Sequence, residues 1–171
     1  MSIRSVIDIR YAQIRSMDIS NSEGISVSLF VQGCDFHCKG CFNSETWDWN
    51  GGKEFTKEQV TTILNLCNKP HIKSFCILGG EPLHPRNIDV VTELCKTFKE
   101  QYPNKKIWIW TGYTFETYVQ NLKVLNYVDV VIDGQFEFDK KDFKLKHRGS
   151  SNQRIWKLNN GKWSTDGKKE I

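Results

Sequence analysis

The sequence has no apolar run near the roughly 18 residues that a membrane-spanning helix needs, which excludes an integral membrane protein. Its first residues, MSIRSVIDIRYAQIR, alternate charged and apolar side chains, and they lack both the apolar core and the cleavage site of a secretory signal. Internal repeats and low-complexity segments are absent too, and an aromatic content of 12% excludes a disordered chain. We therefore expect a folded, cytosolic protein that makes no membrane contact.

The length of 171 residues excludes a complete eight-fold (β/α) barrel, which needs about 250 residues, and fits one domain. We expect a single domain over residues 1–171, with a core at about 21–135 and a C-terminal extension at 136–171. The net charge of +4 is concentrated in that extension, where ten Lys or Arg residues face five Asp or Glu residues from Glu137 onward. Such a basic tail suits a solvated surface, or contact with nucleic acid or an acidic protein.

Apolar segments alternate with helical patterns along the chain. Strands are predicted at residues 25–31, 74–78, 107–110 and 128–132. Thr56 and Gln59 form a capping box that begins one helix. A second helix is predicted from about Asn87, and 114–125 also has a helical pattern. Strands that alternate with helices predict an α/β fold with a parallel sheet, which at this length is at most a partial (β/α) barrel.

The remaining segments are short. Asn160-Gly161, between apolar residues, predicts a small hairpin in the C-terminal extension. The sequence does not decide whether the residues before Asn21 form a strand. The cysteine cluster, GGEP, WTGY and Asp133-Gly134 each follow the carboxyl end of a predicted strand. Because ligands gather at that edge of a parallel sheet, we expect these sequences to form one site.

Three of the six cysteines crowd together as Cys34-x3-Cys38-x2-Cys41, while Cys67, Cys76 and Cys95 lie in apolar segments and are expected in the core. Zinc would need a fourth ligand; His37, next to Cys38, could serve, but no second Cys/His pair lies at finger or ribbon spacing. A redox dithiol would use two cysteines and leave the third without a role. Three thiolates on a compact loop suit an iron–sulfur cluster with one iron open to an outside ligand. We prefer the cluster.

On these residues the sequence resembles the radical S-adenosylmethionine superfamily, whose hallmark is Cys-x3-Cys-x2-Cys after the first strand of a partial (β/α) barrel. That superfamily usually has an aromatic residue just before the third cysteine, but here Gly40 stands there and Phe42 follows. The Gly-Cys-aromatic order is similar to the activating proteins of anaerobic ribonucleotide reductases. Further stretches carry the same resemblance from about Val31 to Arg154: GGEPLHP at 79–85, IWIWTGY at 107–113 and RGSSNQ at 148–153.

The resemblance implies a cofactor pair. Cys34, Cys38 and Cys41 would bind three irons of a [4Fe–4S] cluster and act catalytically through it, and S-adenosylmethionine would chelate the fourth iron. Gly40, Cys41 and Phe42 would contact the adenosine end of that ligand, unless Phe42 is a core aromatic.

The GGEP motif would hold the methionine end of the same ligand. Gly79 and Gly80 would let the backbone approach closely, or simply form a turn. Glu81 would accept a hydrogen bond from the ammonium group, or serve as a helix-end charge. Arg148 would hold a carboxylate or steer a partner, or form a surface salt bridge.

The resemblance further implies a reaction and a partner. Reductive cleavage of S-adenosylmethionine would yield a 5′-deoxyadenosyl radical, which removes a hydrogen atom from one glycine of an anaerobic ribonucleoside-triphosphate reductase. The electron would come from a donor such as flavodoxin or a thioredoxin/reductase system, and we expect no direct role with nucleic acid. Two alternatives stay open: a small-molecule radical enzyme of the 7-carboxy-7-deazaguanine synthase type, and a non-catalytic zinc or redox module.

Overall fold

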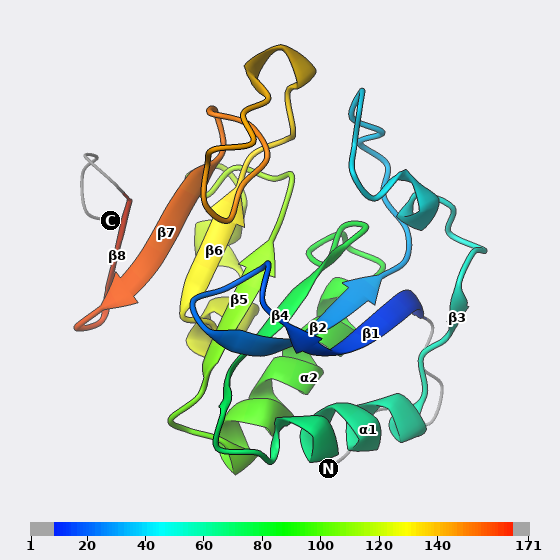
Figure 1. Ribbon diagram of the computed structural model, residues 1–171, viewed down its shortest axis with the longest axis vertical. Helices are drawn as coiled ribbons and strands as arrows, with labels where there is room; N and C mark the ends of the chain where they lie inside the picture. The colour runs from blue at the N-terminus through cyan, green and yellow to red at the C-terminus, as the bar shows by residue number, and fades with distance from the viewer. Residues whose placement is uncertain (1–8, 166–171) are drawn as a thin grey trace.

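A computed structural model of the chain describes residues 9–165 (Figure 1). The start of the N-terminal segment and two lysines of the basic tail, Lys168 and Lys169, lie outside the described residues. The fold is mixed α/β, with an eight-stranded sheet in the order β3-β1-β2-β4-β5-β6-β7-β8. Its strands are β1 (Arg10–Asp18), β2 (Ile25–Val31), β3 (Lys53–Glu54), β4 (Ile72–Gly79), β5 (Lys106–Trp110), β6 (Val130–Asp133), β7 (Arg154–Asn159) and β8 (Lys162–Thr165). The edge strands β3 and β8 do not pair, so the sheet is not a closed barrel.

The centre of the sheet is parallel, as the sequence predicts. Strands β2, β4, β5 and β6 pair in parallel, and all four predicted strands are found within a few residues of their expected bounds. Val31 lies opposite Gly79, and Trp110 lies opposite Ile132. This register brings the cysteine loop, the GGEP turn, the WTGY turn and the end of β6 to one edge of the sheet.

Two α-helices, α1 (Lys57–Cys67) and α2 (Ile88–Gln101), pack on one face of the sheet (Figure 1). The predicted capping box begins α1: the Thr56 side chain accepts from the backbone of the first turn, and the Gln59 side chain accepts from Thr56 N. Apolar residues of both helices form the main core with alternate residues of the central strands, and Cys67 and Cys95 are buried there. No helix in residues 9–165 is long and apolar enough to cross a membrane.

The prediction of a helix over 114–125 is wrong. Two short 3-10 turns, η2 (Val119–Asn121) and η3 (Lys123–Asn126), stand there with Leu122 extended between them. Tertiary contacts prevail over the local pattern because Phe115 N donates to Asp133 Oδ2 at 2.8 Å, and the Phe115 ring stacks on Trp156 with centroids 4.3 Å apart. These contacts hold the segment against the ends of β6 and β7.

Antiparallel strands extend the sheet at both ends. β1, which the sequence left undecided, pairs with β2 and carries the short strand β3 on its other edge. The predicted hairpin is confirmed as β7 and β8, and Asn160 and Gly161 adopt the positive φ values of 51° and 77° that a tight hairpin turn of this type requires. The extension therefore joins the same sheet through the pairing of β6 with β7.

Candidate functional site

A cavity of about 380 Å³ lies against the sheet face that the helices leave uncovered. Phe30, Leu78 and Trp110 line it, and each alternates along its strand with residues of the helix-side core. The four sequences expected to form one site all contribute to its wall: the cysteine loop, the GGEP turn, the WTGY turn and Gly134. The cavity lies at the carboxyl ends of the parallel strands, where the sequence predicts a site.

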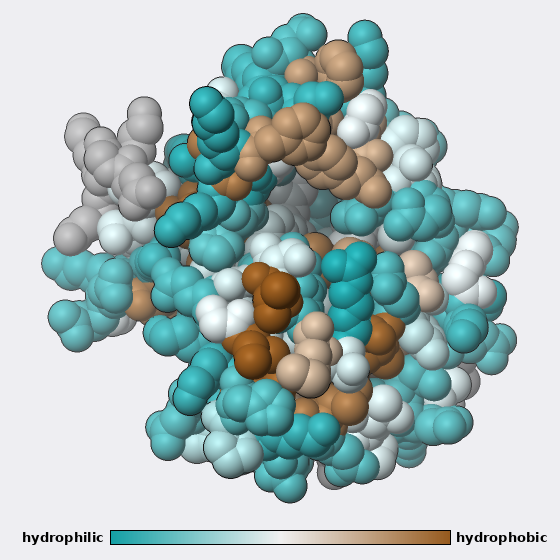
Figure 2. Space-filling view, viewed as in Figure 1, coloured by the Kyte–Doolittle hydropathy of each residue, from teal (hydrophilic) through white to brown (hydrophobic). Residues whose placement is uncertain are grey.

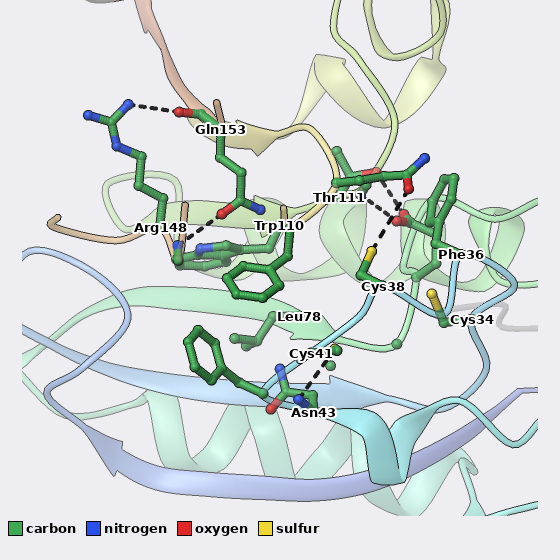
Figure 3. Close-up of a pocket in the computed structure, with 18 of the residues that line it drawn as sticks. Cys34, Phe36, Cys38, Cys41, Asn43, Leu78, Trp110, Thr111, Arg148 and Gln153 are labelled. Atoms are coloured by element: carbon green, nitrogen blue, oxygen red, sulfur yellow. Dashed lines mark hydrogen bonds between the residues drawn. The ribbon is translucent and has the colours of Figure 1, made fainter. Parts of the chain in front are cut away.

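All three clustered cysteines line this cavity as free, half-buried thiols (Figure 3). Burial raises the pKa of Cys34 to about 11, and burial also raises the pKa of Cys38. Cys41 Sγ accepts a hydrogen bond from Asn43 N at 3.4 Å. Within the described part of the chain, no group of three or more His, Cys, Asp or Glu side chains is arranged to hold a single metal ion. The thiols therefore share one cavity without meeting at a single point.

A polar clasp holds the first half of the cysteine loop to the rest of the protein. Asp35 accepts from Trp49 Nε1 at 2.8 Å through one carboxylate oxygen, and its other oxygen lies 2.8 Å from His84 Nε2. The hydrogen bonds from Trp49 and His84 lower the pKa of Asp35. Sequence reasoning missed this clasp, because the partners stand far from Asp35 in the chain; the one signal is that His84 belongs to the GGEPLHP motif.

Aromatic rings fix the middle of the loop. The Phe36 ring meets Tyr113 edge-on with centroids 4.9 Å apart, and it lies so close to Gly112 that a Cβ there would be 2.6 Å from the ring. The His37 ring stacks on Trp47 at 4.6 Å. The cysteine loop is thus packed against the WTGY turn on one side and η1 (Ser44–Thr46) on the other.

The two glycines of the GGEP turn are packed against the start of the cysteine loop. Gly79 has a φ of +105°, and a Cβ on Gly80 would lie 2.5 Å from the carbonyl oxygen of Gly33. Gly80 N donates to Val31 O and Glu81 N donates to Gly33 O, both at 2.8 Å. Glycine is required here because two backbones approach more closely than any side chain permits.

Glu81 is almost fully buried at 2% exposure, and its carboxylate is held by donors of its own chain. Oε1 accepts from Gly112 N at 2.6 Å, and Oε2 accepts from Thr111 Oγ1 at 2.7 Å and Leu83 N at 2.9 Å. Burial raises the pKa of Glu81 to about 7, against the lowering effect of these bonds. The carboxylate thus joins the GGEP turn to the WTGY turn beneath the cavity.

The RGSSNQ stretch closes the opposite wall, and Figure 3 shows Arg148 and Gln153 across the cavity from Cys34 and Cys38. Gln153 accepts from Gly149 N and donates to Gly134 O, both at 2.9 Å. Arg148 Nη1 donates to Gln153 O at 2.7 Å, so Arg148 bonds a backbone carbonyl instead of the carboxylate of a surface salt bridge. This wall is built by the extension, which the sequence-based core of 21–135 leaves out.

Gly40 and Phe42 stand at the rim of the cavity. Phe42 lines it and is 58% exposed, so it is not a core aromatic; its ring lies 5.1 Å from that of Phe136. Gly40 has a φ of +74°, and a Cβ there would be 2.5 Å from the Phe138 ring. Cys76, by contrast, is buried as expected.

Comparison with known proteins shows the family of the chain. A family model described as a 4Fe-4S single cluster domain matches residues 20–156. An anaerobic ribonucleoside-triphosphate reductase-activating protein of Enterobacteria phage T4 is 40% identical over 156 residues, which cover 91% of this chain and 99% of that protein. Proteins with the same description from Pasteurella multocida and Escherichia coli K12 are 41% and 40% identical, over 86% of this chain and 97% and 98% of theirs. The chain belongs to the family of anaerobic ribonucleoside-triphosphate reductase-activating proteins.

Proposed function

We propose that this protein activates an anaerobic ribonucleoside-triphosphate reductase by generating a glycyl radical on it, with a [4Fe–4S] cluster and S-adenosylmethionine as cofactors. The observation that carries the proposal is the convergence of three free thiols, at the spacing Cys34-x3-Cys38-x2-Cys41, on one cavity with the GGEP turn. The descriptions of the relatives name their target, an anaerobic ribonucleoside-triphosphate reductase, and its activation, which supports the proposed partner.

The residues present suit an iron–sulfur cluster. Cys34, Cys38 and Cys41 would hold three irons, because thiolates are soft donors that favour iron. Burial keeps the Cys34 and Cys38 thiols protonated, so metal binding must displace their protons. The Asp35 clasp and the Phe36 and His37 contacts would orient these ligands, as outer contacts do around metal sites.

The cavity also suits S-adenosylmethionine. Its volume of about 380 Å³ falls in the ~300–1,000 Å³ range of small-molecule sites. Gly79 and Gly80 would present backbone to the methionine end, and Glu81 would accept from its ammonium through the second lone pair of Oε1, which has one donor in the structure. Gly40, Cys41 and Phe42 would contact the adenosine end, with Phe42 offering an exposed ring face.

When bound, these cofactors supply one-electron reductive cleavage of a sulfonium and so the removal of a hydrogen atom from carbon. The chain contributes position and the exclusion of water. Glu81 ties the GGEP turn to the WTGY turn and would hold the floor of the site in position around the ligand. Gln153 anchors the RGSSNQ wall to Gly134, and Phe42 and Phe136 border the mouth, which a protein substrate would cover.

The remaining features are part of the same proposal. The curved parallel centre of the sheet would act as a partial (β/α) barrel of the radical S-adenosylmethionine type, within one domain of core 21–135 and extension 136–171. The electron would come from a donor such as flavodoxin or a thioredoxin/reductase system. Six free cysteines support a reducing, cytosolic location.

The test begins with anaerobic iron and sulfide analysis and electron paramagnetic resonance of the dithionite-reduced protein. We expect about four irons per chain and a cluster signal that changes when S-adenosylmethionine is added. Incubation with the purified reductase should then produce an organic radical on the reductase. Cys38→Ser should abolish both signals, whereas the buried Cys76→Ser should retain them. Zinc without sulfide in the wild-type protein would refute the proposal.

A further inference from the structure

Beside the cavity mouth, exposed phenylalanines lie among lysines in a patch that we call the aromatic lip. It consists of Phe42, Phe138, Phe143, Lys39, Lys140, Lys141 and Lys144. We infer that the aromatic lip is the docking surface for a segment of the reductase that carries acidic and apolar side chains. This inference deepens the proposed function and rests on it.

The aromatic lip contains most of the exposed large hydrophobic side chains in residues 9–165. Five large hydrophobic side chains are exposed in residues 9–165, and three of them are Phe42, Phe138 and Phe143, at 58%, 42% and 81%. Figure 2 shows an arc of hydrophobic surface along the upper edge of a hollow, over the loops that rise from the carboxyl ends of the strands. A contiguous exposed apolar patch of this kind marks an interaction site.

Two rings of the lip, those of Phe42 and Phe138, are held in place by close packing. A Cβ on Gly149 would lie 2.9 Å from the Phe42 ring, and the Phe42 and Phe143 centroids are 6.4 Å apart. On the other side, the Phe138 ring packs over Gly40 inside the cysteine loop. The lip therefore joins the cysteine loop to the loop that contains η4 (Phe138–Lys140), and it presents a preformed surface.

Lysines give the same surface its charge. Lys141 Nζ lies 4.9 Å from the Phe138 centroid and 5.0 Å from that of Phe143, and Lys39 Nζ lies 5.1 Å from Phe138. Ammonium groups over ring faces at an exposed site are attracted by about 0.5–1 kcal/mol, which leaves them available to pair with carboxylates. The complementary partner therefore offers apolar groups next to negative charge.

The position of the lip favours a protein partner. Phe42, Phe136 and Leu145 line the cavity, whereas Phe143 is exposed outside its lining, so one occupant that covers the lip also covers the mouth of the site. A cofactor inside the cavity would reach Phe42 but not Phe138 or Phe143, which do not line it. Glu137 pairs with Lys140 at 3.2 Å, and the exposed Asp139 and Asp142 interrupt the run of lysines. The surface therefore lacks the continuous positive charge that binds a phosphate backbone, whereas single carboxylates of a protein segment can pair with Lys39 and Lys141.

The test measures reductase binding and reductase activation with two variants of the cluster-loaded protein. Phe143→Ser removes the most exposed ring, and Lys140→Glu/Lys141→Glu/Lys144→Glu reverses the charge. We expect each variant to raise the dissociation constant for the purified reductase by about tenfold or more, the range of an interface hot spot. The charge variant should also lose the salt dependence of the association rate. Cleavage of S-adenosylmethionine by dithionite without the reductase should stay at the wild-type rate.

Matched controls separate the lip from general effects. Phe143→Leu retains an apolar group and should keep most of the affinity, and Lys57→Glu/Lys96→Glu/Lys123→Glu makes the same charge change on exposed positions away from the lip. Unchanged affinity and activation in both lip variants would overturn the inference, as would a single-stranded DNA oligonucleotide that binds through the lip and displaces the reductase. A wild-type protein that cleaves no S-adenosylmethionine would refute the proposed function, whereas full cleavage with lip-independent binding would refute this inference alone.

Discussion

Arg154 links β7 to two carboxylates that differ in burial. This difference allows a quantitative test of how far burial sets the stability that is lost when an ion pair is broken. Its Nε and Nη2 donate to the two oxygens of Asp133 at 3.1 and 2.6 Å, and Nη1 and Nη2 donate to Glu116 at 2.8 and 2.5 Å. The Asp133 side chain is 1% exposed, whereas that of Glu116 is 48% exposed. The hydrogen bonds to Glu116 and Asp133 raise the pKa of Arg154, so the cation persists at every accessible pH.

The loss in free energy of unfolding depends on which carboxylate is left without its cation. Arg154→Met leaves Asp133 buried with only the hydrogen bond from Phe115 N, and removing one partner of a buried pair costs about 3–5 kcal/mol. Glu116→Gln breaks a half-exposed pair and should cost less than about 1 kcal/mol. Arg154→Lys keeps the charge but loses the two-pronged contact, so we expect an intermediate loss of about 1–2 kcal/mol.

The assay is urea unfolding under anaerobic conditions, followed by circular dichroism, with equal metal loading of every variant. Double-mutant cycles of Arg154→Met with Asp133→Asn and with Glu116→Gln would apportion the energy between the two carboxylates. The reasoning fails if Glu116→Gln costs as much as Arg154→Met, or if Arg154→Met costs under about 1 kcal/mol, because either result means that burial of Asp133 does not govern the pair.

Three further outcomes are expected. Gly80→Ala places a Cβ 2.5 Å from Gly33 O and should destabilise the fold by about 1–3 kcal/mol in urea and reduce iron retention; a variant with wild-type iron content would contradict the close packing. The pKa of Glu81 is raised from 4.5 to about 7, so its contribution to stability is complete below pH 4.5 and is lost as the pH rises through 7. Relative to Glu81→Gln, the free energy of unfolding of the metal-free wild type should therefore fall by about 3 kcal/mol between these pH values. A rise over the same range would mean that the hydrogen bonds to Glu81 outweigh its burial. Asp35→Ala opens the clasp to His84 and Trp49, and should broaden the cluster's paramagnetic resonance signal without unfolding the chain, which circular dichroism would check.

Local patterns in the sequence determine much of this fold. β2 occupies the predicted residues, α1 begins at the predicted capping box, and the turn at Asn160-Gly161 joins β7 and β8. Each of these features depends on neighbours within a few residues, so periodicity, capping and turn chemistry suffice to locate it. The cysteine spacing belongs to the same class, because a single loop carries all three thiols.

Tertiary contacts determine the rest. The segment 114–125 is not an α-helix, because Phe115 is held by Asp133 and Trp156, which lie far along the chain. The undecided N-terminal segment becomes β1 because β2 offers a free edge with which it pairs.

Some features of the site also follow from the sequence, whereas others depend on tertiary contacts. The sequence locates the cysteines, the GGEP turn and Glu81, but it does not contain the burial of that carboxylate or its donors at Thr111 and Gly112. Nor does it show that Asp35 meets His84, or that Phe42 and Phe143 share one exposed lip. These arrangements join residues tens of positions apart, and sequence spacing carries no information on which distant side chains the sheet register brings together.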